Sequence, residues 1–186
     1  MSTEGAPTVE LALPAGVKVE VHGRTLTAQG PLGKIVRPFP ADVLHLTTSP
    51  GKLVLELGLP AHRKQSRALL RTWAAHLENI SAGLTLGFVA RLKVVAAHFP
   101  MKVSVKGDEL VIENFLGEKY PRSIRLVAGT TAKVDGEFVV VEGFDIEHVG
   151  QSAAAIERTT RIRDYDPRVF QDGIYLIERA RRKEAN

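Results

Sequence analysis

Two halves of this sequence match each other at a nearly constant spacing. Gly33 corresponds to Gly117, an offset of 84 residues. Other positions keep almost the same register: Val19 with Val103, Val21 with Val105, Gly23 with Gly107, Leu26 with Leu110, Leu32 with Leu116, and, after two small insertions, Gly58 with Gly143 and Gln65-Ser66 with Gln151-Ser152. A register kept over roughly 50 residues indicates a duplicated supersecondary unit. The sequence therefore predicts two similar domains in tandem.

Each half begins with the alternation of apolar and polar residues that is typical of a half-buried strand. Val17, Val19 and Val21 alternate with polar residues in the first half, and Val103 and Val105 do so in the second. A glycine turn and another strand follow in each half, which indicates β-meanders. Further strands are expected at residues 24–29, 43–48, 53–57, 109–113, 123–127 and 138–141, with the apolar run 84–97 as a strand crossing between the domains.

Each half then changes to the spacing of a helix. Between residues 63 and 80 the apolar residues Leu70, Trp73, Leu77 and Ile80 recur every three or four positions, which predicts a helix that Gly83 can end. Its counterpart is expected at residues 150–163, where small residues allow close packing on a sheet.

Strands followed by a helix, twice, favour an α+β fold of two duplicated domains, each a mainly antiparallel sheet with one helix on one face. We expect an N-terminal domain at residues 1–82 and a C-terminal domain at residues 83–176, the latter binding most of any nucleic acid. Residues 177–186 have few apolar side chains, so a flexible basic tail is expected there.

Charge points to a polyanionic partner. The net charge is +4, and the segment from Arg158 to Lys183 alone carries eight basic residues against four acidic ones. The chain has no cysteine, which excludes disulfides, thiolate metal sites and a cysteine nucleophile. Neither a signal-like start nor an apolar run of about 18 residues is present, so we expect a soluble cytoplasmic protein without a membrane partner.

Catalytic and metal-binding patterns are weak. The six histidines lack the spacing of a helical metal site, and the loop at residues 30–34 departs from the phosphate-binding pattern. His98, in an apolar context, is expected to be structural and to find a hydrogen-bond partner. An enzyme using His98, Asp145 and Asp164 remains an alternative, although none of the three recurs in the first half. We predict no enzymatic activity, no cofactor and no metal.

Basic residues form two groups. Arg63, Arg67 and Arg71 recur every four residues on the first helix, with Lys64 beside them, and are expected to be a solvated face. The second group alternates with aromatic residues, a combination suited to phosphate contacts and base stacking in folded RNA. It comprises Arg158, Arg161, Arg163 and Arg168 with Tyr165 and Phe170, followed by Tyr175.

Several long motifs carry a family resemblance. They are AHFP at residues 97–100, IENFLGEK at 112–119, DIE at 145–147 leading to QSAA at 151–154, and VFQDGIY at 169–175. With these motifs the chain resembles the large-subunit ribosomal protein six family, in its archaeal and eukaryotic form. Two departures stand out: Ala96 occupies a position that is often aromatic in the family, and residues 164–168 replace a lysine- and glycine-rich stretch of bacterial members.

The resemblance implies a monomeric ribosomal constituent that binds large-subunit ribosomal RNA, beside neighbouring ribosomal proteins and near the region where translational GTPases dock. The RNA contacts carried over are Lys119, Arg122, Gln151, Ser152, Arg158, Arg161, Arg163, Arg168 and Tyr175, and the tail adds Arg179, Arg181 and Arg182. An RNA-binding regulator or chaperone that works off the ribosome remains an open alternative.

Overall fold

The computed structural model describes residues 7–58, 64–163, 165, 166 and 168–184, which form two compact units. The first unit is Met1–Leu86 and the second is Gly87–Asn186. The division falls four residues after the expected one at residue 82. Among the described residues, no helix is both long and apolar enough to cross a bilayer.

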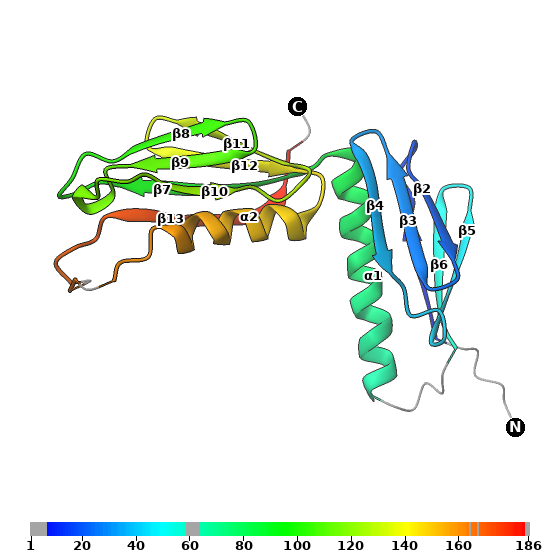
Figure 1. Ribbon diagram of the computed structural model, residues 1–186. Helices are drawn as coiled ribbons and strands as arrows, with labels where there is room; N and C mark the ends of the chain where they lie inside the picture. The colour runs from blue at the N-terminus through cyan, green and yellow to red at the C-terminus, as the bar shows by residue number, and fades with distance from the viewer. Residues whose placement is uncertain (1–6, 59–63, 164, 167, 185–186) are drawn as a thin grey trace, which may run out of the picture. The chain divides into compact units, whose positions relative to one another are not determined.

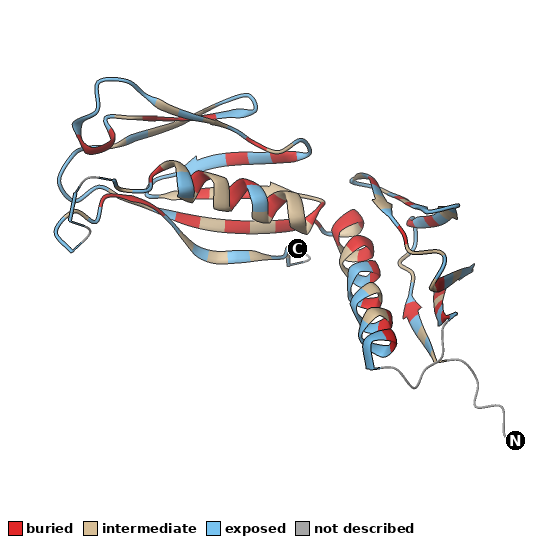
Figure 2. Ribbon diagram, turned by 60° about the horizontal axis from the view of Figure 1, so that its bottom comes forward, coloured by how far each residue is buried: buried red, intermediate tan, exposed pale blue. Residues whose placement is uncertain are grey.

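The described residues of the first unit form six strands and one helix. Its two antiparallel sheets have the orders β1-β6-β5 and β2-β3-β4, and α1 packs against strands of both (Figure 1). The strands are β1 (Thr8–Ala12), β2 (Lys18–His22), β3 (Thr25–Gly30), β4 (Gly33–Pro38), β5 (Leu44–Ser49) and β6 (Lys52–Leu57), and the helix is α1 (Lys64–Thr85). Figure 2 shows the buried residues of α1 gathered on one side of the helix, as the apolar spacing predicts.

The helix α1 does not end at Gly83 as expected. It continues to Thr85 because the turn between β3 and β4 covers its last residues. Leu84 is fully buried, and its carbonyl accepts a hydrogen bond of 3.2 Å from the backbone N–H of Leu32. The close approach requires a glycine at position 30, where an added Cβ would lie 2.7 Å from the Cβ of Leu84.

The second unit repeats this design, with seven strands and one α-helix among the residues that the structure describes. Its sheets have the orders β11-β12-β7-β13 and β10-β9-β8, and α2 packs on the four-stranded sheet (Figure 1). The elements are β7 (Phe88–Val95), β8 (Lys102–Lys106), β9 (Glu109–Glu113), the 3-10 turn η1 (Phe115–Gly117), β10 (Arg122–Arg125), β11 (Thr130–Asp135), β12 (Phe138–Gly143), α2 (Ile146–Thr159) and β13 (Gly173–Arg182). The predicted duplicated α+β fold is confirmed.

Three boundaries differ from the expectation. The strand β7 belongs wholly to the second unit and does not cross between domains. The helix α2 begins four residues earlier than predicted because the Asp145 carboxylate caps it, accepting the Glu147 N–H at 2.9 Å. It ends at residue 159 and not at 163, and the Thr160 hydroxyl then accepts a bond from the N–H of Ile174 in β13.

Residues 177–182 do not form the flexible tail that was predicted for them. These residues form most of β13, which pairs with the otherwise open edge of β7. Backbone hydrogen bonds between β13 and β7 stabilise this segment, although it has few apolar side chains. Ion pairs add to it: Glu178 lies 3.7 Å from Arg91, and Lys183 lies 2.9 Å from Glu142. Residues 185 and 186 lie outside the described residues.

Candidate nucleic-acid interface

Three exposed arginines follow α2 and precede β13. Within the described part of the chain, Arg161, Arg163 and Arg168 have no carboxylate at ion-pairing distance. Arg158 is also exposed, but its Nε donates to the Ala154 carbonyl at 3.2 Å within the helix. Unpaired guanidinium groups can form bidentate contacts with phosphate without first breaking an internal ion pair. This segment therefore presents several guanidinium groups that are available for phosphate.

A buried carboxylate joins this segment to the loop after β7. Asp172 is 1% exposed, and its Oδ1 accepts hydrogen bonds from the backbone N–H groups of His98 at 2.9 Å and Phe99 at 3.4 Å. Its Oδ2 lies 2.7 Å from Nδ1 of His98. Burial raises the pKa of Asp172, but the three donors outweigh burial and hold it below the ordinary value of 3.8. The carboxylate is therefore ionised at neutral pH.

Three rings stand in a row beside this carboxylate. The ring of His98 lies 4.8 Å from that of Phe170, which in turn lies 4.8 Å from that of Tyr165. Tyr165 is 50% exposed and Val169 is 58% exposed, so an apolar and aromatic surface lies next to the free arginines. Exposed rings beside arginines can contact both the bases and the phosphates of an RNA.

The loop around η1 supports the same end of the unit. Asn114, Leu116 and Gly117 all have positive φ angles, and the amide of Asn114 donates to the Pro100 carbonyl at 3.0 Å. A Cβ at residue 117 would lie 3.1 Å from the ring of Phe99, so glycine is needed there for both its conformation and its size. The residues of this loop thus hold the segment after β7 in place.

Lys119 and Arg122, the two predicted RNA contacts beside this loop, differ in whether their side chains have partners within the unit. Lys119 is exposed, as an RNA contact requires. Arg122 is engaged internally, because it donates to both carboxylate oxygens of Glu118, at 2.8 and 2.5 Å, and its guanidinium lies 4.3 Å from the centre of the Phe115 ring. The hydrogen bond from Arg122, with burial opposing it, lowers the pKa of Glu118 below 4.5. The guanidinium of Arg122 is therefore already engaged by side chains of the same unit.

The predicted contacts Gln151 and Ser152 do not lie at the start of the second helix. Gln151 and Ser152 lie in the middle of α2, and Ser152 is 1% exposed. Its hydroxyl accepts the Val127 N–H at 3.0 Å and lies 2.9 Å from the hydroxyl of Thr130. Ser152 therefore joins the helix to the sheet and cannot reach a ligand. Gln151 is exposed but has no backbone donors of a helix start beside it.

The predicted contacts on β13 are all exposed, but some of them have partners within the unit and others do not. The hydroxyl of Tyr175 donates to the Gln171 carbonyl at 3.1 Å, and Arg181 lies 3.0 Å from Glu178. Arg179 and Arg182 are exposed and have no carboxylate partner among the residues that the structure describes. This strand adds two further available guanidinium groups to the surface.

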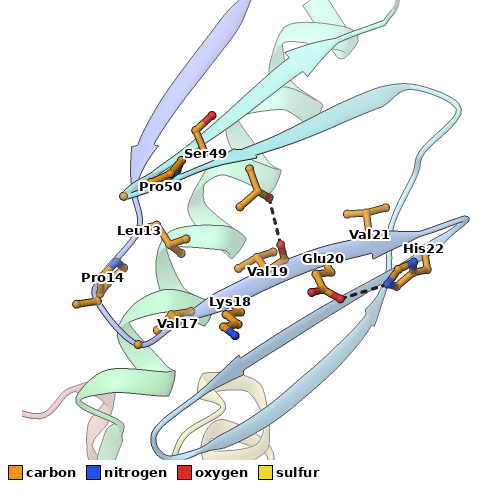
Figure 3. A pocket seen from close by; sticks show the side chains of 14 residues that line it. Leu13, Pro14, Val17, Lys18, Val19, Glu20, Val21, His22, Ser49 and Pro50 are labelled. Carbon is orange, nitrogen blue, oxygen red and sulfur yellow. Dashed lines mark hydrogen bonds and ion pairs between the residues drawn. The ribbon is translucent and has the colours of Figure 1, made fainter.

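The first unit carries a groove of a different character (Figure 3). Apolar side chains of β2 and of the flanking turns line it, and the Thr48 hydroxyl donates to the Val19 carbonyl at 3.1 Å. Lys18 is the only lysine or arginine among the lining residues described. The basic stripe of α1 lies elsewhere: Arg67 and Arg71 are exposed, and Arg63 is outside the described residues. The groove lacks the charge that a polyanion needs.

Among the described residues, the side chains named for the enzyme alternative do not come together as a catalytic site. Asp145 caps α2, Asp164 lies outside the described residues, and His98 pairs with Asp172. The described residues contain no cluster of three or more histidine, aspartate or glutamate side chains that could hold a metal ion. The hydrogen-bond partner expected for His98 is therefore Asp172, which lies 74 residues away and which the sequence analysis missed.

Comparison with known proteins gives consistent matches. The family model described as Ribosomal protein L6 matches residues 99–173. The chain is 42% identical to large ribosomal subunit protein uL6 of Methanosarcina mazei over 180 residues, which cover 97% of this chain and 100% of the relative. The protein of the same name from Methanospirillum hungatei is 44% identical over 175 residues, 93% of this chain and 98% of the relative. That from Methanobrevibacter smithii is 42% identical over 170 residues, 91% and 94% of the two chains.

Proposed function

The chain belongs to the uL6 family of large ribosomal subunit proteins, and we propose that it serves as a structural constituent of that subunit by binding its ribosomal RNA. The binding surface is the end of the second unit where residues 97–101 and 114–119 meet the described residues of the segment between α2 and β13 (160–163, 165, 166 and 168–172). The observation that supports this most is the group of arginines Arg161, Arg163 and Arg168, which have no carboxylate partner among the described residues, in the same segment as the exposed ring of Tyr165. Its role is structural and not enzymatic.

The affinity for RNA comes largely from counterion release. Arg161, Arg163 and Arg168 reach phosphates, while Lys119, Arg158, Tyr175, Arg179 and Arg182 extend the contact along the same unit. Each cation that neutralises a phosphate releases condensed counterions, so the affinity depends steeply on salt. In keeping with the family, the RNA bound lies near the docking region of translational GTPases, with other ribosomal proteins as neighbours. The protein enters this assembly as a monomer.

Two measurements test this function. In filter binding, transcripts of large-subunit ribosomal RNA should be retained saturably, with a loss of affinity of about 10³-fold or more between about 50 and 200 mM salt. In sedimentation of cell extracts, the protein should stay with large subunits through a high-salt wash. Recovery at the top of the gradient would favour the regulator or chaperone that works off the ribosome. Retention that is unsaturable or independent of salt would contradict RNA binding.

A further inference from the structure

The buried carboxylate of Asp172 fixes the orientation of the His98 ring. An ionised carboxylate can only accept hydrogen bonds, so Nδ1 of His98 must carry the proton in their 2.7 Å contact. The same carboxylate also accepts the backbone N–H groups of residues 98 and 99. Both the backbone and the ring of His98 are therefore held by one side chain, as second-layer carboxylates hold functional histidines elsewhere.

Through that ring the carboxylate also determines where Tyr165 lies. His98 packs on Phe170, and Phe170 packs on Tyr165, with 4.8 Å between ring centres at each step. The backbone closes the segment as well, because the Phe170 N–H donates to the Asp166 carbonyl at 2.9 Å. Tyr165 is the outermost and most exposed ring of the row. Loss of the carboxylate would therefore release the whole row.

The surroundings of Tyr165 fit a nucleotide. Arg163 and Arg168 lie on either side of it in the sequence, and both are exposed without a carboxylate partner in the described part of the chain. An exposed ring in the same segment as two available guanidinium groups offers stacking to a base, and the guanidinium groups offer charge to its phosphates. A base inside a duplex has both faces covered by its neighbours, so an unpaired base offers the face that this ring needs.

We propose that Tyr165 stacks on an unpaired base of the RNA and that Asp172 is the positioning residue that holds Tyr165 in place through His98 and Phe170. This inference rests on the proposed RNA-binding function and adds to it the class of nucleotide that is recognised.

The experiment measures the affinity of the full chain for large-subunit ribosomal RNA transcripts over a range of salt concentrations. Tyr165→Leu should weaken binding about 5- to 100-fold. It should leave the slope of log affinity against log salt unchanged, because no phosphate contact is lost. Tyr165→Phe should restore most of the lost affinity, since it keeps the ring. Tyr120→Leu is the matched control, an exposed tyrosine of the same unit outside the row.

A double variant separates positioning from a general effect on folding. Asp172→Asn should weaken binding by a similar factor, because an amide cannot accept from all three donors of residues 98 and 99. If Asp172 acts through Tyr165, the variant carrying both Asp172→Asn and Tyr165→Leu should bind no more weakly than Tyr165→Leu alone.

Two results would overturn the inference while leaving RNA binding intact: wild-type affinity in Tyr165→Leu, or losses that multiply in the double variant. Failure of the wild-type protein to bind RNA saturably would instead contradict the proposed function itself, and the inference with it.

Discussion

A guanidinium nitrogen of Arg122 lies 2.6 Å from the carbonyl oxygen of Thr159. The bond joins the first residue of β10 to the last residue of α2, where helix carbonyls lack partners within the helix. The same side chain also pairs with Glu118. One arginine thus connects the sheet, the loop before it and the end of the helix, which is the point from which the arginine-rich segment departs.

Arg122→Met should lower the free energy of unfolding by about 1–3 kcal/mol, because the hydrogen bonds from Arg122 to the Thr159 carbonyl and to the Glu118 carboxylate are lost. Urea denaturation monitored by circular dichroism measures the change. Arg125→Met, on the exposed face of the same strand, is the control and should change stability by less than about 0.5 kcal/mol. Equal effects of the two variants would contradict the assigned role.

Ser152→Ala should also destabilise the protein, by about 1–3 kcal/mol, since the N–H of Val127 would be left without its acceptor. The folded variant should bind RNA with wild-type affinity, because Ser152 is buried inside the unit. Gln151→Ala, one residue earlier on the exposed side of α2, should leave stability nearly unchanged. If Ser152→Ala lost RNA affinity while remaining folded, Ser152 would contact RNA after all, and the conclusion drawn from its burial would be wrong.

Asp172 should make stability dependent on pH in the acid range. Its pKa is lower in the folded protein than in the unfolded chain, so the unfolded chain takes up the proton first as the pH falls. The stabilisation is complete above about pH 3.8 and is lost as the pH falls through the lower folded-state pKa. The difference in unfolding free energy between wild type and Asp172→Asn should therefore shrink below about pH 4.

Urea titrations at pH 5, about pH 4 and about pH 3 test this, and the contribution of Glu118 cancels because it is common to both proteins. A difference that stays constant over this range would show that the carboxylate gains nothing from its three donors.

Two glycines should respond to alanine in opposite directions. Gly30→Ala places a methyl group 2.7 Å from the Cβ of Leu84 and 3.2 Å from its carbonyl oxygen, so the hairpin must move away from the end of α1 at a cost of about 1–3 kcal/mol. Gly150→Ala meets no atom within 4 Å in the middle of α2 and should stabilise by roughly 0.5–1 kcal/mol. Thermal melts of both variants provide the measurement.

The fold follows from the sequence wherever a local pattern decides it. The alternation at Val19 and Val21 predicts β2, and the matching alternation at Val103 and Val105 predicts β8. The predictions fail where distant contacts decide the outcome. β13 forms because β7 offers an open edge, and α1 passes Gly83 because a hairpin covers Leu84. Neither partner can be recognised from the neighbouring residues alone.

The candidate site, like the fold, is predictable where a local pattern decides it and unpredictable where distant contacts do. Interleaved arginines and aromatic residues identify residues 158–170 without a structure. The pairing of His98 with Asp172 could not be found, because 74 residues separate the two and neither belongs to a local motif of known chemistry. The prediction for Ser152 failed since the start of α2 depends on the cap at Asp145, which the sequence analysis placed in an enzyme alternative instead.

The salt dependence of RNA affinity in a triple arginine variant tests the central claim most directly. Substituting alanine for Arg161, Arg163 and Arg168 should reduce the slope of log affinity against log salt by about 2–3, one phosphate contact for each arginine. The control removes the same charge from the first unit by substituting alanine for Lys34, Lys64 and Arg71, and should keep the wild-type slope. Equal slopes in the two triple variants would contradict RNA binding by this end of the second unit.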